Sequence, residues 1–324
     1  MPFLVRQTIR GFDHHRAGCA PIFLPGQSKT PTSAPLPVQH LGMAVSIVPP
    51  EGHEYEMQAQ RLKIFGERNT GTNALAQLIK KNIGEIVCPG VAHEVVADWP
   101  ERSRSIADFD EPYRLFLHHA MIDDIFSAMP AECAFKHTAP EFSPRFIEEE
   151  IGIIFLVKNP YSWLVSMFRR PHGLLLPKVD DFSVFLRRPW LTLARDNLPR
   201  VLASPIEMWN RKVAAYCRFG SAAARHGLPF CILRFEDFVQ DQLAALRTIR
   251  TAFGFPGEQA VPIVNSTKEP GLDMRYYRMY YSTEAWRGIF SPADLAFCLA
   301  AIDWHLAATF AYSKIEPNTV PNAC

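Results

Sequence analysis

Apolar and polar residues follow one another along the chain in blocks that predict strands and helices in alternation. The run RLKIFGE from Arg61 predicts a strand, and a Gly/Thr/Asn turn separates it from ALAQLIKKNI, whose apolar residues have helical spacing. Further strands are predicted at YRLFLHH, ECAFKH, IGIIFLV and PFCILRF, and helices at 160–169, 205–225, 237–253 and 292–309. This alternation indicates an α/β fold with a central, mainly parallel sheet and helices on both faces.

Composition divides the 324 residues into three parts. Residues 1–57 are rich in Pro, Gly, Ser and Thr, which interrupt helices and sheets, and this predicts a loosely ordered N-terminal arm. An ordered arm anchored by its few large apolar residues is the alternative. Residues 58–315 carry the alternating pattern and predict one α/β domain, and residues 316–324 form a C-terminal tail.

Charge and hydropathy limit the classes of partner. The formal net charge is only +1, so we expect no nucleic-acid partner, and any anion site has to be local. The longest apolar run, 151–157, is far shorter than the ~20 residues of a membrane helix, so no membrane span is predicted. The first residues lack the apolar stretch of a secretory signal, and the seven cysteines stand singly without metal-ligand spacing. We therefore expect a cytoplasmic protein with free thiols and no metal.

A first candidate site lies between the strand at Arg61 and the following helix. The segment GERNTGTN, residues 66–73, has the GxxxxG frame of a phosphate-binding loop, in which backbone N–H groups and a helix N-terminus bind an anion. Thr72 stands where a nucleotidase needs Lys, and Asn73 replaces the Ser or Thr that binds magnesium. The loop thus argues against a P-loop kinase but retains anion binding, unless it is an ordinary strand-to-helix turn.

A second candidate site follows the buried strand at 151–157, in the segment KNPYSWLVS. Asn159 is suited to cap the next helix and Pro160 to its first turn. Ser166 then lies on that helix close to Lys158 in space. A cation and a hydroxyl in this arrangement would bind one phosphate group.

These two segments, in this order, resemble the donor-binding motifs of the sulfotransferase family. Lys158 and Ser166 take the Arg and Ser places of R-N/D-P-x-D-x-x-x-S. Residues 68–73 align with P-K-S-G-T-T, residues 232–238 resemble L-R-Y-E-D-L, and residues 286–291 resemble W-K-x-x-F-T. The resemblance covers about 61–312. It implies a P-loop NTPase-like fold and 3′-phosphoadenosine 5′-phosphosulfate as donor, without a metal.

The resemblance also implies which residues bind the donor, and where this chain departs from the pattern. Asn69 replaces the family Lys, which leaves Arg68 as the nearest cation, and Ala74 stands where cytosolic members have a Trp that stacks on adenine. The C-terminal R-K-G triplet is absent, and Arg275 and Arg278 are the predicted replacements. The full predicted donor site comprises Arg68, Asn69, Thr70, Gly71, Thr72, Asn73, Lys158, Ser166, Arg275 and Arg278.

The catalytic base is predicted from the segment FKHTAP, residues 135–140. It resembles the K-T-H-L-P segment of cytosolic sulfotransferases, whose His is the base, with His and Thr in swapped order. His137 is our candidate because imidazole titrates near neutrality. Arg68 and Lys136 complete the predicted catalytic set, with Lys136 either pairing with the sulfate or simply exposed. His118, His119, Glu67 and Glu94 stay open as alternative bases.

The sequence thus predicts an enzyme that moves a sulfuryl group from 3′-phosphoadenosine 5′-phosphosulfate to a hydroxyl or amine of a small-molecule or glycan acceptor. The alternative is a non-catalytic nucleotide-binding or scaffold protein on the same fold, because Asn69 replaces the family Lys. Four tyrosines, at 276, 277, 280 and 281, either line an acceptor pocket or pack on a helix face. No residue pattern selects the acceptor or the oligomeric state.

Overall fold

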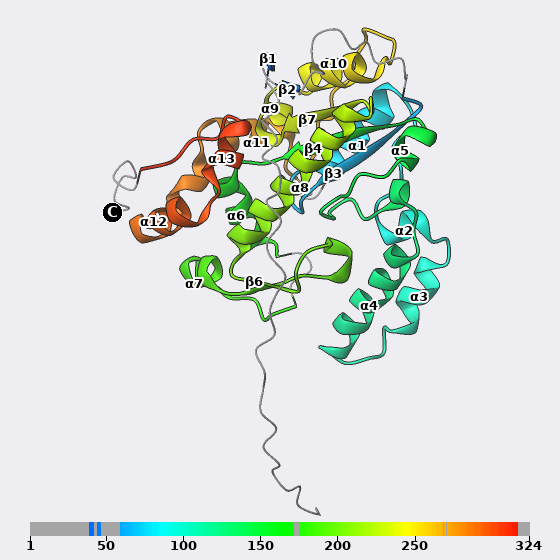
Figure 1. Ribbon diagram of the computed structural model, residues 1–324. Coiled ribbons are helices and arrows are strands. Elements are labelled where there is room, and N and C mark those ends of the chain that lie inside the picture. Colours follow the sequence, from blue (N-terminus) through cyan, green and yellow to red (C-terminus); the bar gives the residue numbers. More distant parts are fainter. Residues whose placement is uncertain are drawn as a thin grey trace, which may run out of the picture. The chain divides into compact units, whose positions relative to one another are not determined.

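The structure, a computed structural model, describes residues 39–41, 44–46, 59–171, 175–267, 269 and 271–316 (Figure 1). Its centre is a five-stranded sheet in the order β1-β2-β7-β4-β3. Strands β3 (Arg61–Gly66), β4 (Ile151–Val157) and β7 (Phe230–Arg234) are parallel. The short strands β1 (Gln39–Leu41) and β2 (Ala44–Ser46) extend the sheet beyond β7 through antiparallel pairs.

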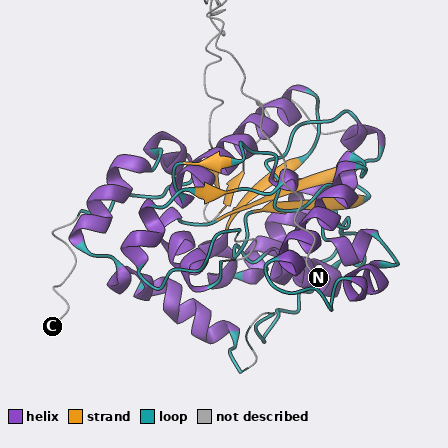
Figure 2. Ribbon diagram, turned by 90° about the horizontal axis from the view of Figure 1, so that it is seen from below, coloured by secondary structure: helices purple, strands orange, loops and turns teal. Residues whose placement is uncertain are grey.

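Helices cover both faces of this sheet (Figure 2). Helices α1 (Thr72–Asn82) and α10 (Gln242–Phe253) pack on one face, and α5 (Arg145–Glu148) and α8 (Pro205–Arg225) on the other. The other described elements are α2 (Ala92–Val95), α3 (Trp99–Ser105), α4 (Tyr113–Ser127), η1 (Ala131–Cys133), α6 (Pro160–Arg169), α7 (Phe182–Arg187), β5 (Trp190–Leu191), η2 (Ala194–Asp196), β6 (Val201–Leu202), α9 (Phe235–Gln240), α11 (Met274–Ser282), η3 (Ala285–Ile289), α12 (Pro292–Ala301) and α13 (Trp304–Thr309).

Strand β4 lies at the middle of the core, and every one of its residues is buried. Its side chains alternate between the two faces. Phe155 stacks on Tyr216 of α8 with ring centroids 5.1 Å apart, and Gly152 faces Phe253 of α10 on the opposite side. A strand covered on both sides needs the continuous apolar sequence that IGIIFLV provides. The predicted fold class, α/β with a mainly parallel central sheet between helices, is confirmed.

Polar caps break two of the predicted helices. The helix predicted at 237–253 is two helices, α9 and α10, with Asp241 between them accepting from the backbone N–H groups of Leu243 and Ala244. The helix predicted at 292–309 is likewise divided into α12 and α13, and Asp303 caps α13. The predicted helices 160–169 and 205–225 and the strands β3, β4 and β7 are confirmed.

Two strand predictions are wrong. YRLFLHH forms the first half of the fifteen-residue helix α4, in which Leu117, Met121 and Ile125 turn inward at a spacing of four while Phe116 is exposed. ECAFKH begins within the 3-10 helix η1 and then runs irregularly, although the N–H of Lys136 donates to the carbonyl of Gly90 and its carbonyl accepts from the N–H of Gly66 at the end of β3.

The predicted arm, apart from β1 and β2, and the predicted tail, apart from residue 316, fall outside the described residues, and the domain boundaries stay a prediction. No helix within the described ranges has the length and apolar character needed to cross a membrane.

Replacing Gly152 with Ala should destabilise the protein by about 1–3 kcal/mol, because a Cβ at this position would lie 2.5 Å from Cε1 of Phe253 in a packed core. The matched control is Gly288→Ala, since a Cβ there meets nothing within 4 Å. Urea unfolding of both variants measures the difference. Equal midpoints for Gly152→Ala and the wild type would contradict the packing of α10 on β4.

Candidate functional site

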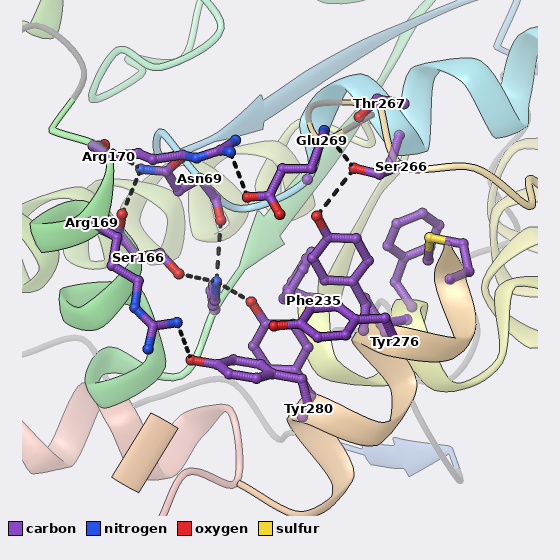
Figure 3. Close-up of a pocket in the computed structure, with 18 residues that line it drawn as sticks. Asn69, Ser166, Arg169, Arg170, Phe235, Ser266, Thr267, Glu269, Tyr276 and Tyr280 are labelled. Atoms are coloured by element: carbon purple, nitrogen blue, oxygen red, sulfur yellow. Dashed lines mark hydrogen bonds and ion pairs between the residues drawn. The ribbon is translucent and has the colours of Figure 1, made fainter. Parts of the chain in front are cut away.

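The register of the parallel strands brings the two predicted segments to one edge of the sheet. Gly66, the last residue of β3, pairs with Leu156, the second-last residue of β4. The loop after β3 and the segment after β4 therefore leave the sheet side by side. A cavity of about 190 Å³ lies at this edge, and Asn69, Gly71 and Ser166 are among the residues that line it (Figure 3).

The loop reaches the cavity through left-handed backbone conformations. Gly71 has φ +82°, and a Cβ there would lie 2.6 Å from Cε2 of Phe235, so both the conformation and the space require glycine. Asn69 also has positive φ, at 64°. Gly71 directly precedes α1 and supplies no side-chain cap. The first N–H groups of α1 are thus available to an anion at this edge.

Lys158 is the central cation of the cavity. Its side chain is buried, with 1% of the residue's surface exposed, and its Nζ donates to Oγ of Ser166 at 2.8 Å, to the carbonyl of Asn69 at 3.3 Å and to the hydroxyl of Tyr281 at 2.7 Å. The ring of Phe235 lies 4.6 Å from the same nitrogen. The predicted pairing of Lys158 with Ser166 is therefore present in the structure. An ammonium and a hydroxyl side by side can bind one phosphate.

Two arginines that the sequence analysis did not include also line the cavity. Arg169 donates to the hydroxyl of Tyr280 at 3.0 Å, and Arg170 pairs with Glu269 at 2.5 Å (Figure 3). They follow Ser166 at i+3 and i+4 on or just after α6, which places them beside it. This spacing was the signal by which the sequence could have identified them.

The four tyrosines of α11 line this same cavity, together with the donor-motif residues. The rings of Tyr276 and Tyr280 are stacked at 6.0 Å with an interplanar angle of 20°. Tyr281 is buried, and burial raises the pKa of its hydroxyl. The cavity wall opposite the loop is therefore aromatic, with hydroxyl groups at its surface.

The structure places Arg275 and Arg278, the predicted replacements of the family triplet, outside this lining. Arg275 is paired with Asp273 at 2.8 Å, and its side chain is 88% exposed. Arg278 donates through Nε to the carbonyl of Val239 at 3.2 Å. Both belong to α11, but its tyrosines and not these arginines line the cavity.

Arg68 differs from its predicted placement, because its guanidinium is held inside the protein. It pairs with Asp196 at 2.9 Å and with Glu67 at 3.1 Å, and Lys212 pairs with the same two carboxylates at 3.4 and 3.2 Å. All four side chains are at most 5% exposed. Burial alone would raise the pKa of Asp196, but the charges of Arg68 and Lys212 outweigh it and hold that pKa below its usual 3.8. Because Glu67 and Arg68 belong to the loop, the network holds the start of the loop against the protein interior.

His137 and Lys136 lie beside the start of α1. Nδ1 of His137 is 2.5 Å from the carbonyl oxygen of Gly66, which can only accept, so Nδ1 carries the proton and Nε2 holds the lone pair. Burial and the positive charges of Arg68 and Lys136 lower the pKa of His137 well below its usual 6.5. Nζ of Lys136 donates to Oδ1 of Asn73 at 2.6 Å, and burial lowers the pKa of its ammonium.

The other candidate bases make structural contacts. His118 and His119 belong to α4, and Nη2 of Arg195 lies 3.0 Å from Nδ1 of His119. Burial and the charge of Arg195 lower the pKa of His119 to about 4. Glu94 accepts from the backbone N–H groups of Gly90 and Val91, and Glu67 belongs to the buried network.

Of the known proteins compared with this chain, only solved structures match it. No protein-family model and no curated protein sequence matches the chain. Solved structures do match it, and among them are three sulfotransferases at 14–16% identity.

A sulfotransferase from Alicyclobacillus acidocaldarius has a TM-score of 0.37 and 16% identity, over 79% of this chain and 97% of that chain. The sulfotransferase domain of the Synechococcus PCC 7002 olefin synthase has a TM-score of 0.43 and 14% identity, over 82% and 98%. Mouse sulfotransferase SULT7A1, solved in complex with PAP, has a TM-score of 0.34 and 14% identity, over 79% and 75%.

Replacing Asp196 with Asn should destabilise the protein by about 3–5 kcal/mol, because Arg68 and Lys212 would lose one of their two buried carboxylate partners. The control is Glu101→Gln, an exposed partner of Arg104 whose loss should cost less than about 1 kcal/mol.

Because the pKa of Asp196 is lowered on folding, its contribution to the free energy of unfolding is fully present above the unfolded pKa of about 4. This contribution is lost as the pH falls through the lower pKa of the folded state. Urea unfolding at neutral pH and below pH 4 measures both effects. A variant as stable as the wild type at neutral pH would contradict the buried network.

Proposed function

We propose that this protein is a sulfotransferase that uses 3′-phosphoadenosine 5′-phosphosulfate as donor. The observation that carries the proposal is the meeting of Lys158 and Ser166 with the loop at Gly71 around one cavity. Lys158 and Ser166 would bind the 3′-phosphate, and the backbone N–H groups of the loop and of α1 the 5′-phosphosulfate. This division assigns the two ends of one nucleotide to two segments that the sheet brings together.

The rest of the cavity suits the same ligand. Arg169 adds positive charge for a nucleotide that carries several negative charges, whereas the charge of Arg170 is paired with Glu269. The tyrosine wall of α11 offers flat faces on which adenine can stack, which would replace the Trp that is absent at Ala74. In the structure the hydroxyl of Tyr281 occupies a hydrogen-bonding position on Lys158 that a phosphate oxygen would take.

In the transfer step, an acceptor oxygen forms a bond to sulfur while the bond between sulfur and the bridging oxygen breaks, and its electron pair leaves with the 5′-phosphate. The acceptor's proton goes to Nε2 of His137, which is the unprotonated nitrogen of a neutral imidazole. Lys136 and the N-terminus of α1 would stabilise charge that develops on the transferred group. A metal ion has no part in this scheme.

The alternative, a non-catalytic nucleotide-binding protein on the same fold, rests on Asn69. Nδ2 of Asn69 donates to the carbonyl of Arg170 at 3.0 Å, so this side chain holds the loop against the end of α6. An amide is neutral, so Asn69 does not supply the positive charge of the Lys that stands here in the sulfotransferase motif. The enzyme is the proposal argued here because His137 beside the loop is a neutral imidazole whose Nε2 holds a lone pair, as the role of base requires. The described free thiols, such as Cys88 and Cys231, support a reducing compartment, and we include a cytoplasmic location in the proposal.

Replacing Lys158 or Ser166 with Ala should weaken the binding of 3′-phosphoadenosine 5′-phosphate by about 10- to 100-fold, because each removes a hydrogen bond to a charged phosphate. Lys80→Ala is the control, since its exposed side chain belongs to the last turn of α1, pairs with Glu85 and does not line the cavity. Isothermal titration calorimetry gives the affinities. No binding to the wild type would refute donor use.

Replacing His137 with Ala should lower kcat by about 100-fold or more and leave the affinity for 3′-phosphoadenosine 5′-phosphate unchanged, if His137 accepts the acceptor's proton. Release of the labelled nucleotide product measures turnover.

The wild type should also keep a constant kcat/KM from neutral pH down to pH 6.5. We expect kcat/KM to fall only below pH 6.5, because protonation removes the Nε2 lone pair and the pKa of His137 lies below 6.5. Full activity of His137→Ala would assign the base to another residue.

A further inference from the structure

Two tryptophans hold the backbone of the two segments that meet at the donor cavity. Nε1 of Trp209, on α8, donates to the carbonyl of Lys158 at 3.0 Å. Nε1 of Trp163, on α6, donates to the carbonyl of Arg68 at 3.0 Å. Both tryptophans are buried, with at most 2% of either residue exposed. Because Lys158 carries the central cation and Arg68 belongs to the loop, one indole holds each segment.

Neither tryptophan is part of the sulfotransferase motifs. Trp163 stands at a position that R-N/D-P-x-D-x-x-x-S leaves open, and Trp209 lies outside the four segments that resemble the family. The family resemblance therefore assigns these indoles no role, and their contacts are a property of this chain.

The side chain of Lys158 needs support that an arginine at the same place would need less. A guanidinium is a planar group of fixed shape, whereas a lysine carries its charge on a flexible four-carbon stem. The rings of Phe235 and Tyr281, 4.6 and 4.8 Å from Nζ, hold the charged end of this stem. The direction in which the stem starts depends on the backbone of Lys158. A fixed backbone thus lowers the cost of ordering this side chain around a ligand.

The peptide between Lys158 and Asn159 is bound through both of its polar groups. Its carbonyl accepts from Trp209, and its N–H donates to Oε1 of Glu236 at 3.1 Å. Glu236 is held in turn, because the same oxygen accepts from Oγ of Ser162 at 3.1 Å. Any rotation of this peptide that redirects the Lys158 side chain therefore has to break two hydrogen bonds.

Trp163 holds the loop in a comparable way. In a trans peptide the carbonyl and the following N–H point in opposite directions, so the bond to the carbonyl of Arg68 also sets the direction of the N–H of Asn69. Asn69 lines the donor cavity and has a left-handed φ of 64°. Such a conformation persists where its surroundings hold it in place, and Trp163 supplies part of that support.

We propose that Trp209 and Trp163 are positioning residues of the donor site. Trp209 places Lys158 for the 3′-phosphate of the nucleotide, and Trp163 places the loop for the 5′-phosphosulfate. The inference rests on the proposed function and adds to it two residues that do not line the cavity themselves. Because each indole serves one end of the nucleotide, ligands that share only one end separate their roles.

Two nucleotides that differ only in the 3′-phosphate test this division: 3′-phosphoadenosine 5′-phosphate and adenosine 5′-phosphate. Trp209→Phe should weaken the binding of the first by about 3- to 10-fold, through the loss of one hydrogen bond, and leave the binding of the second unchanged. Trp163→Phe should weaken both by the same factor, because both carry the 5′-phosphate. Isothermal titration calorimetry gives the affinities, and its stoichiometry gives the folded fraction of each variant.

A double-mutant cycle tests whether Trp209 acts through Lys158. In a Lys158→Ala background, Trp209→Phe should change the affinity for 3′-phosphoadenosine 5′-phosphate by less than about 2-fold, because no ammonium is left to position. The matched control is Trp304→Phe on α13. It removes the same kind of bond, from Nε1 to the carbonyl of Leu299 at 2.9 Å, away from the cavity, and it should leave both affinities unchanged.

A second substitution separates the lost N–H group from the volume that is lost when phenylalanine replaces tryptophan. Benzothienylalanine introduced in place of Trp209 keeps the shape of both rings and lacks the N–H group. We expect it to reproduce the selective loss of affinity for 3′-phosphoadenosine 5′-phosphate.

The outcomes separate this inference from the proposed function. Equal weakening of both nucleotides by Trp209→Phe, or an undiminished effect in the Lys158→Ala background, would show a general structural role and overturn the inference alone. Wild-type affinities in both Trp209 variants would do the same. Failure of the wild type to bind 3′-phosphoadenosine 5′-phosphate would overturn the inference together with the proposed function.

Discussion

The parallel register of β3 on β4 is the constraint on which the candidate site depends. Because Gly66 lies opposite Leu156, the chain leaves both strands at the same edge, and the loop after β3 meets Lys158 after β4. Helix α6 then returns Ser166 to Lys158 within two turns, since Asn159 caps its first N–H groups and Pro160 opens it. Backbone geometry therefore brings together a cation, a hydroxyl and a helix N-terminus from segments far apart in sequence.

The buried charges beneath the loop explain why its composition departs from a simple anion-binding loop. Glu67 and Arg68 face inward, where Asp196 and Lys212 complete a compact network. Lys212 also donates to the carbonyl of His137, so the network supports the loop and the proposed base together. Removing one member would leave the others charged and buried, which is strongly destabilising. The positive charge at the cavity comes instead from Lys158 and from the end of α6.

Sequence reasoning predicted the sheet strands and the pairing of Lys158 with Ser166, because both follow from local patterns: a continuous apolar run, a cap and a helical spacing. It did not predict which way Arg68 points, since that depends on Asp196 and Lys212, which lie far from it in the chain.

The strand predicted at 113–119 was wrong because a short apolar run fits both periods, and only the further inward positions of α4, such as Ile125, show the helix. The tyrosines of α11 could be listed from the sequence but not placed, because no local pattern specifies which cavity they line. His137 was found from the residues around it, and its tautomer became evident only from the contact with Gly66.

A crystal structure of the protein with 3′-phosphoadenosine 5′-phosphate tests the central claim most directly. The account predicts the 3′-phosphate on Nζ of Lys158 and Oγ of Ser166, with the hydroxyl of Tyr281 displaced from Lys158, and the 5′-phosphate at the backbone of residues 69–73. A nucleotide bound elsewhere, with the contact between Tyr281 and Lys158 intact, would contradict it.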